Sequence, residues 1–406
     1  MKNASYLAVG NILCQIIGFF GFLYIARILG PEKYGIYVTA GAFVGMFTLL
    51  TFSGTDKVMI REGSKNLKEM DKYLERTIGI KNLFALVSIL ICIGSLYITN
   101  YNFQTKIAIV ILSFSLFLTS SKGFIGTIFQ AHEKMGYISI ISVINKLFFT
   151  GSAIFVLYQG YGVLAILSLQ IFYLLVFLIV EYKIAKKFVI FKFWKKVRLD
   201  KTILKPALIL TLLSFFGMLV TKIDLVMISF LGSLKDVGVY GIAYTIVGQG
   251  VMLGNVTSIA FLPILIKRFH EGPVKLKTLF RYSILLGLGV FLLAIVGHVY
   301  AEPLITFLFG QTYSESGKIL SILVFYVAII FFQVPFGNAC IATGNEKLAL
   351  WISPLNATMN VVLNYLLFLR FGLIGIAYAT LIVFTFGTVV SISIYCIKMK
   401  EQGHLI

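Results

Sequence analysis

Residues 26–40 read ARILGPEKYGIYVTA, and residues 228–243 read ISFLGSLKDVGVYGIA. Each stretch ends a long apolar segment with Leu-Gly, crosses a short loop and restarts with glycine, an apolar residue and tyrosine. A second echo links EKMGYISIISVINKLFF at residues 133–149 to EKLALWISPLNATMNVVLNYLLF at residues 346–368. Both offsets slightly exceed 200 residues, half of the chain. A duplicated unit of this length is typical of membrane transporters.

The composition predicts an all-α integral membrane protein. Hydrophobic residues make up 59% of the chain and charged residues only 13%. A membrane-spanning helix needs about 20 consecutive apolar residues, and about twelve such segments are present. We expect spans at residues 5–28, 35–55, 77–99, 103–126, 137–158, 161–182, 205–230, 238–265, 282–300, 317–342, 347–368 and 373–397.

The repeat divides the chain into two pseudo-symmetric six-helix lobes. We predict an N-terminal lobe at 1–182, a basic cytoplasmic linker at 183–204 and a C-terminal lobe at 205–406. In the linker, lysines alternate with Phe, Ile and Trp, which favours an amphipathic segment on the anionic inner leaflet over an ordinary connection. A short interfacial helix is expected at 302–310, a stretch too brief to span.

Basic residues predict the orientation of the chain. With both termini cytoplasmic, 26 of the 35 lysines and arginines fall on the inner side, six fall on the outer side, and three lie deeper within spans. This bias matches the positive-inside rule, so we expect a multi-pass protein of the plasma or inner membrane. The same distribution accounts for the net charge of +19 without nucleic-acid binding.

The sequence predicts no cofactor. The four cysteines lie far apart within apolar segments, which is unlike a disulfide framework or a metal site. No phosphate-cradling Gly-Lys-Ser/Thr loop is present, so direct ATP hydrolysis is not expected. Energy would come from a coupling ion, the membrane potential or removal of product, and the sequence does not choose among these.

Three motifs resemble the polysaccharide-export flippases. They are ARILGPEKYGIY at 26–37, GTDKVMIREGSK at 54–65 and FLFGQTYSESGKILSIL at 307–323. This family shares the multidrug/oligosaccharidyl-lipid/polysaccharide exporter superfamily with multidrug and toxic-compound extruders and lipid II flippases. The lipid II branch usually has fourteen spans, so twelve argue against that branch.

The resemblance implies a V-shaped bundle that is a transporter and not an enzyme. It would flip a lipid-linked oligosaccharide, carried on a polyprenyl phosphate or pyrophosphate, from the cytoplasmic to the outer leaflet by alternating access. Such a substrate requires a polar, cationic cavity between the lobes, because charge is strongly disfavoured in hydrocarbon. Polysaccharide polymerase or glycosyltransferase machinery is a possible partner. We expect a monomer, because two halves already build the cavity.

Charged residues within spans are the main candidates for substrate binding. Lys146 lies near the middle of its span, preceded by Asn145, and would contact the phosphate or sugar head group. The alternative is a structural role opposite a backbone carbonyl or Asp224. The repeat aligns Lys146 with Met359. The next residue, Asn360, places a polar side chain at a similar depth in its own span.

The remaining candidates each carry a structural alternative. Lys222 and Asp224, two residues apart, project from different faces, so one could line the cavity while the other bonds a neighbouring helix. For Lys81, we favour an ammonium group that snorkels to the inner head groups over one that binds substrate in the cavity. Arg27 could meet the phosphate on release or anchor the interface.

Loop and amide residues complete the set. Arg61 and Asp56 could guide the incoming head group or form a loop ion pair of little weight. Five amides within spans could hydrogen-bond sugar hydroxyls, although helix–helix bonding is their commoner use. They are Gln249, Asn255, Gln333, Asn338 and Asn364.

Three rival functions make different predictions. A cation- or drug-exporting transporter of the same superfamily predicts an acidic cavity, whereas three lysines and one aspartate lie within these spans. A major-facilitator-type transporter predicts a Gly-x-x-x-Asp-Arg-x-Gly-Arg-Arg-like loop, which residues 54–65 match only in part. A membrane glycosyltransferase or polymerase predicts a large outer loop or a carboxylate-rich site, and the outer loops here are short.

Overall fold

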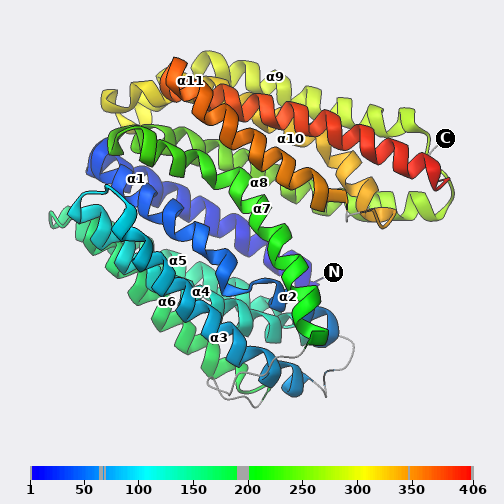
Figure 1. The fold of residues 1–406 in the computed structure, drawn as a ribbon, viewed down its shortest axis with the longest axis horizontal. Helices are drawn as coiled ribbons and strands as arrows, with labels where there is room; N and C mark the ends of the chain where they lie inside the picture. The colour runs from blue at the N-terminus through cyan, green and yellow to red at the C-terminus, as the bar shows by residue number, and fades with distance from the viewer. Residues whose placement is uncertain (1, 64–66, 68–69, 190–200, 346–347, 404–406) are drawn as a thin grey trace. The chain divides into compact units, whose positions relative to one another are not determined.

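The computed structural model describes residues 2–63, 67, 70–189, 201–345 and 348–403, and these ranges contain helices but no strand. The all-α prediction is confirmed. The helices, labelled in Figure 1, are α1 (Lys2–Met46), α2 (Gly54–Gly63), α3 (Met70–Ser95), α4 (Phe103–Ala131), α5 (Met135–Tyr158), α6 (Val163–Ala185), α7 (Lys201–Leu231), α8 (Leu234–His270), α9 (Leu276–Phe309), α10 (Ser314–Ala342) and α11 (Ala349–Glu401). Short 3-10 turns occupy Phe47–Thr51, Leu96–Ile98 and Gln311–Tyr313.

Two of these helices each contain two predicted spans. The apolar stretch that α1 forms with the 3-10 turn after it, Val9–Thr51, is 43 residues long, and that of α11, Ile352–Glu401, is 50 residues long, where one span needs about 20. Non-helical glycines break both, Gly30 at φ 71° in α1 and Gly372 at φ 59° in α11. Pro31 then restarts α1, since proline fixes φ and needs no hydrogen-bond acceptor at a first helical position.

The helices of the described ranges match the predicted spans. Nine helical stretches are long and apolar enough to cross a membrane, and α7, bent by 54° near its middle, would be a tenth. Since α1 and α11 each contain two spans, the total is twelve spans, as predicted. In both halves the repeated Leu-Gly pair marks a span end, at the Gly30 break and at Leu231, where α7 stops.

Two local predictions are wrong. Residues 302–310 form no separate interfacial helix, because α9 continues through Pro303 to Phe309 and stops at Gly310, whose φ is 94°. The stretch after the second span is also not an open loop. It forms α2, an amphipathic helix with Asp56 in its first turn.

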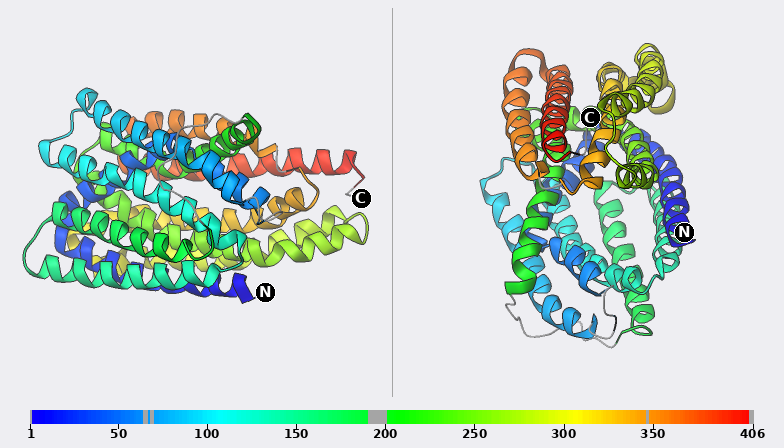
Figure 2. Two further views of the ribbon diagram at one scale, coloured as in Figure 1. Left: turned by 90° about the horizontal axis from the view of Figure 1, so that it is seen from below. Right: turned by 90° about the vertical axis from the view of Figure 1, so that its right-hand side faces the viewer.

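The chain divides into two compact units, Met1–Lys222 and Ile223–Ile406, with the division inside α7. The lobe and linker boundaries at 182/183 and 204/205 remain a prediction, and half of the linker, residues 190–200, lies outside the described residues. In the first unit, α4 packs against α1, α2, α3, α5 and α6. Figures 1 and 2 show these helices, coloured blue to green, alongside one another.

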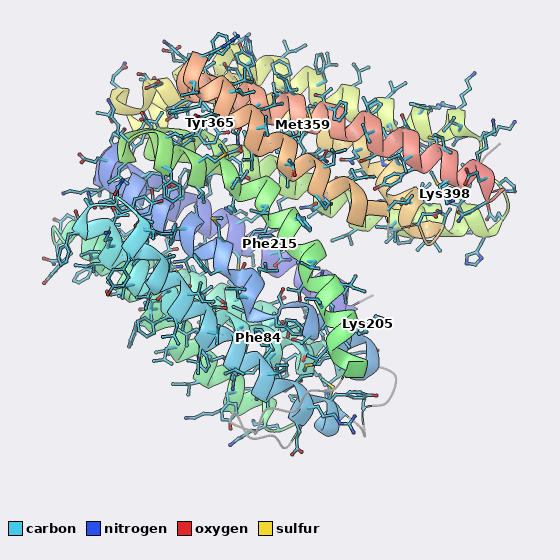
Figure 3. All side chains as sticks on the ribbon, viewed as in Figure 1. Phe84, Lys205, Phe215, Met359, Tyr365 and Lys398 are labelled. Carbon is cyan, nitrogen blue, oxygen red and sulfur yellow. The ribbon has the colours of Figure 1, made fainter. Side chains whose placement is uncertain are left out.

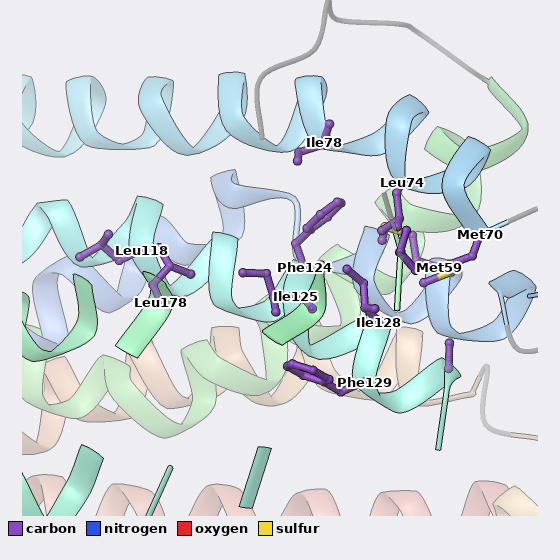
Figure 4. Close-up of a cluster of buried hydrophobic side chains, with 13 residues drawn as sticks. Met59, Met70, Leu74, Ile78, Leu118, Phe124, Ile125, Ile128, Phe129 and Leu178 are labelled. Carbon is purple, nitrogen blue, oxygen red and sulfur yellow. The ribbon is translucent and has the colours of Figure 1, made fainter. Parts of the chain in front are cut away.

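The core of the first unit lies mainly between α3, α4 and α6. Buried side chains such as Leu74, Phe124 and Leu178 interdigitate there, and Met59 adds a side chain from α2 (Figure 4). Phe84, labelled in Figure 3, stacks on Phe52 with ring centroids 5.3 Å apart. These contacts fix α2 and α4, which carry charged residues described below.

In the second unit, α10 packs against α8, α9 and α11. Its core includes Leu265, Leu279, Phe336 and Met399, all fully buried. Ser233 caps α8 in a reciprocal capping box with Asp236, which satisfies two backbone donors at the helix start.

Candidate functional site

The seam between α1 and α5 positions Lys146. A Cβ atom added to Gly10 would lie 2.7 Å from Ser139 Cβ, and one added to Gly18 would lie 2.7 Å from Lys146 Cε. Ser139 donates its hydroxyl to the Tyr6 carbonyl at 2.7 Å, which ties the two helices together. The two glycines therefore let α5 approach α1 closely and lay the Lys146 side chain along α1.

Lys146 is a half-buried cation in the middle of α5. Its Nζ lies 6.0 Å from the Phe149 ring centroid, within reach of a cation–π attraction, and it acts electrostatically on Cys14 of α1. No carboxylate pairs with Lys146 among the residues that the structure describes. An ammonium group at membrane depth without an acidic partner suits an anionic ligand.

The snorkelling interpretation of Lys81 is wrong. Its side chain is only 2% exposed, and its ammonium group pairs with the Asp56 carboxylate of α2. Gly123 of α4 lies against this pair, since a Cβ there would sit 2.7 Å from Asp56 Oδ2. Asp56 therefore contacts Lys81 in place of the expected loop partner Arg61, whose side chain lies outside the described residues.

Sequence reasoning missed a second ion pair in the same unit. Lys122 Nζ of α4 lies 3.1 Å from Glu181 Oε1 of α6, with side chains 24% and 4% exposed. The expected span at 103–126 places Lys122 at its inner end, whereas α4 continues to Ala131. The carboxylate of Glu181 near the end of an apolar span was the signal available in the sequence.

Five charged residues thus lie at a similar depth along the helices of the first unit. They are Lys81, Lys122, Lys146, Asp56 and Glu181. Lys81 contacts the helical turn at Gly123, next to Lys122, and Cys14 is within electrostatic range of both Lys122 and Lys146. Asp56 neutralises Lys81, and Glu181 neutralises Lys122. Among the residues that the structure describes, no carboxylate neutralises Lys146.

The second unit contains a buried carboxylate, Asp224, which is 1% exposed. Its Oδ1 accepts from Asn364 Nδ2 at 2.7 Å, and its Oδ2 accepts from Thr380 Oγ1 at 2.8 Å and Tyr240 OH at 3.1 Å. Asn364 Nδ2 also donates to Asn360 Oδ1 at 3.0 Å. Asp224 therefore joins α7, α8 and both halves of α11.

This network offers oxygen atoms to a small cation or a proton. Asn364 Oδ1 is buried with no hydrogen-bond partner in the described part of the chain. Carboxylate, amide and hydroxyl oxygens are ligands that hard cations prefer. No cluster of three or more His, Cys, Asp or Glu occurs among the described residues, so a transition-metal centre has no support there.

Several predicted amides meet in a pocket of the second unit. Asn255, Gln333 and Asn338 line a cavity of about 360 Å³ between α8 and α10. Asn338 Nδ2 donates to the Ser258 carbonyl at 2.8 Å, and its Oδ1 accepts from the Ser258 hydroxyl at 2.8 Å. Asn338 therefore bonds helix to helix, while Asn255 is exposed and Gln333 is half-buried.

The remaining predicted residues differ in how far they are exposed. Arg27 is exposed at the end of the first half of α1, and Asn145 is half-buried beside Lys146. Lys222 is exposed whereas Asp224 is buried, which confirms that the two project from different faces of α7. Met359, labelled in Figure 3, is half-buried on α11, one residue before the fully buried Asn360.

The comparisons with known proteins identify the family. The sequence pattern described as "Polysaccharide biosynthesis protein" matches residues 1–270, and that described as "MatE" matches residues 206–366. The chain belongs to the polysaccharide biosynthesis protein family. The first match covers well over half of the chain, and the long apolar helices make this a multi-pass membrane protein.

Two curated relatives align with most of this chain. It is 25% identical to the capsular polysaccharide biosynthesis protein CapF of Staphylococcus aureus over 387 residues, 93% of this chain and 94% of that protein. It is 18% identical to the probable low-salt glycan biosynthesis flippase Agl15 of Haloferax volcanii over 96% of this chain and 82% of the relative.

A solved structure supports the fold. An inward-facing multidrug resistance MATE family transporter of the MOP superfamily superposes with a TM-score of 0.79, covering 99% of each chain at 15% identity. At that identity the likeness concerns the fold alone.

Proposed function

We propose that this transporter flips a lipid-linked oligosaccharide from the cytoplasmic to the outer leaflet for cell-surface polysaccharide or glycan assembly, and that it is not an enzyme. The observation that carries the proposal is Lys146, a half-buried cation at mid-helix without a carboxylate partner among the described residues. The relatives' names, one in capsular polysaccharide biosynthesis and one a glycan flippase, support the same substrate class.

The substrate sets the physical requirement. Its head group carries phosphate charge and sugar hydroxyls, and a single charge at the bilayer centre costs about 2.5–3.5 kcal/mol or more. Lys146 offsets that cost by pairing with the phosphate, while the polyprenyl tail remains in lipid. The polar pocket at Asn255, Gln333 and Asn338 offers hydrogen bonds to sugar hydroxyls.

Asp224 supplies the coupling site in this proposal. A proton or small cation bound at the carboxylate neutralises a charge that is otherwise fully buried, which favours the ion-bound state of the second unit. An ion gradient across the membrane would then bias the alternation of access. The unpartnered Asn364 Oδ1 supports this role, because it provides a further oxygen beside Asp224.

The orientation and setting follow from the charge distribution. Both termini face the cytoplasm of a plasma or inner membrane, since the basic residues gather in the loops on that side. The transporter works as a monomer and supplies its product to polymerase or glycosyltransferase machinery outside.

Export of cations or drugs is the second candidate function. Asp224 favours it, because a buried carboxylate attracts cationic substrates, and the MatE sequence match overlaps this part of the chain. Lys146 opposes it, because a cation near the binding region repels such substrates.

Reconstitution separates the two functions. Purified transporter is placed in liposomes with a radiolabelled polyprenyl-diphosphate oligosaccharide, and the sugar accessible from the opposite side is followed over time. Protein-dependent appearance of the sugar supports the flippase. Expulsion of a cationic dye, with no movement of the oligosaccharide lipid, overturns the proposal in favour of the exporter.

A further inference from the structure

Three asparagines form a row on one face of the first half of α11. Asn356, Asn360 and Asn364 are spaced by four residues, so their side chains lie one above the next along the helix. Asn360 and Asn364 are fully buried, whereas Asn356 is half-buried. At a rise of about 1.5 Å per residue the row is roughly 12 Å long, and it ends where Asn364 Nδ2 donates to Asp224. This asparagine row therefore connects a partly accessible side chain to a fully buried carboxylate.

The second half of α11 covers the asparagine row. Figures 1 and 2 show the two halves of this helix, coloured orange and red, running side by side. A Cβ atom added to Gly387 would lie 2.5 Å from Asn356 Nδ2 and 2.6 Å from its Oδ1, so this glycine leaves the space that the amide occupies. At the other end of the row, Thr380 donates to Asp224 at 2.8 Å. The row is thus enclosed at both ends between the two halves of α11.

Each asparagine of the row has a buried amide atom without a hydrogen-bond partner in the described part of the chain. These atoms are Asn356 Oδ1, Asn360 Nδ2 and Asn364 Oδ1, so an acceptor, a donor and an acceptor follow one another. Buried amide groups of native proteins are nearly always hydrogen-bonded, either to protein or to ordered water. Water both donates and accepts, and it can therefore satisfy all three atoms in turn.

The surroundings of Asp224 suit a carboxylate that gains and loses a proton. Three side chains donate directly to it, namely Asn364, Thr380 and Tyr240. Their hydrogens, and not their lone pairs, point at the carboxylate, which stabilises its charged form. Asn360 also acts on Asp224, although its Nδ2 makes no direct hydrogen bond. A polar contact of this length is commonly bridged by a water molecule.

From this arrangement we infer that the asparagine row holds a chain of buried water molecules that conducts protons between Asp224 and the accessible end of the row at Asn356. The Asp224 carboxyl gives its proton to the nearest water, each water accepts one proton and passes one on, and the carboxylate left behind is stabilised by its three donors. Asn356 is a positioning residue for the water and does not touch the transported lipid. The inference rests on the coupling role proposed for Asp224 and narrows the coupling ion to a proton.

Proton flux through the reconstituted transporter tests the inference. Purified protein is placed in liposomes that enclose a pH-sensitive dye and contain a polyprenyl-diphosphate oligosaccharide, and a pH gradient is imposed. Asn356→Leu replaces the amide by an apolar side chain of similar size, which interrupts the water chain and should reduce the protein-dependent proton flux at least tenfold. Thr358→Leu makes an apolar change at an exposed position of the same helix and should match the wild type.

A pair of side chains with nearly the same shape guards against an effect of packing alone. Valine and threonine differ by a hydroxyl group, so Asn356→Val and Asn356→Thr fill nearly the same volume. The threonine hydroxyl can hydrogen-bond a water molecule in place of the amide, whereas valine cannot. Proton flux through Asn356→Thr should therefore exceed that through Asn356→Val at least threefold.

Several results would overturn the inference. Wild-type proton flux in a folded Asn356→Leu protein does so, as does equal flux through Asn356→Val and Asn356→Thr. A wild type that conducts no protons, with or without a response to a Na⁺ gradient, also overturns it, and each of these results leaves the flippase proposal standing. A wild type that moves no lipid-linked oligosaccharide overturns the proposed function instead, and the dependence of its proton flux on Asn356 decides the water chain separately.

Discussion

The Lys81 ammonium group and the Asp56 carboxylate, with side chains 2% and 21% exposed, form a largely buried ion pair that joins α3 to α2, with Gly123 of α4 packed against the carboxylate. Removing one partner of a buried pair leaves an uncompensated charge, which typically costs about 3–5 kcal/mol. We expect Lys81→Met to lower the melting temperature markedly. Thermal unfolding of the detergent-solubilised protein, followed by intrinsic fluorescence, measures the change.

The double variant Lys81→Met/Asp56→Leu controls for this prediction. It removes both charges and should recover much of the lost stability, because replacing a buried pair by apolar residues is often neutral. Equal melting temperatures for Lys81→Met and the wild type would contradict the buried-pair assignment and restore the snorkelling interpretation.

The packing of α1 against α5 predicts that alanine substitutions at Gly10 and Gly18 of α1 lower the stability to different extents. In Gly10→Ala the new methyl group meets Ser139 Cβ at 2.7 Å and its Cα at 3.2 Å, so α5 must move, at a cost of about 1–3 kcal/mol. In Gly18→Ala it meets only the flexible end of Lys146, which can turn aside. Melting temperatures should therefore fall more for Gly10→Ala than for Gly18→Ala, and the reverse order would refute this packing.

The buried Asp224 carboxylate leads us to predict that transport depends on an ion gradient across the membrane. Asp224→Asn keeps the side-chain shape but removes the charge that a proton or cation would neutralise. We expect transport by this variant to become insensitive to imposed Na⁺ or pH gradients, while the wild type responds to at least one of them. Flipping rates in liposomes with each gradient applied separately measure the effect.

Asp236 provides the matched control. Asp236→Asn changes a half-buried carboxylate at the start of α8, away from the Asp224 hydrogen bonds, and should leave any gradient response intact. If Asp224→Asn responds to the gradients as the wild type does, Asp224 has a structural role only.

Much of the fold was predictable because membrane spans have a strong sequence signal. Apolar segments of about 20 residues and the repeated Leu-Gly pairs located the helices. The error at 302–310 arose because the span was taken to end at residue 300, whereas α9 is 34 residues long and includes Pro303. Helix α2 was missed because its polar composition resembles that of a loop.

The candidate site was less predictable, because its charges pair across distant parts of the chain. Lys146 was identifiable from its depth alone. The partners of Lys81 and Lys122 depend on how α2, α4 and α6 pack, and spacing along the sequence carries no such information. Likewise, the hydrogen bonds from Asn364 and Thr380 to Asp224 cross about 140 and 156 residues of sequence.

The most direct test of the account is the initial rate of oligosaccharide-lipid flipping by Lys146 variants in liposomes. Lys146→Ala removes the half-buried mid-helix cation and should reduce the rate at least tenfold, whereas Lys146→Arg should retain most of it. Lys235→Ala, an exposed lysine in the second unit, is the control and should match the wild type. Wild-type flipping by a folded Lys146→Ala protein would contradict the central claim that Lys146 binds the anionic head group.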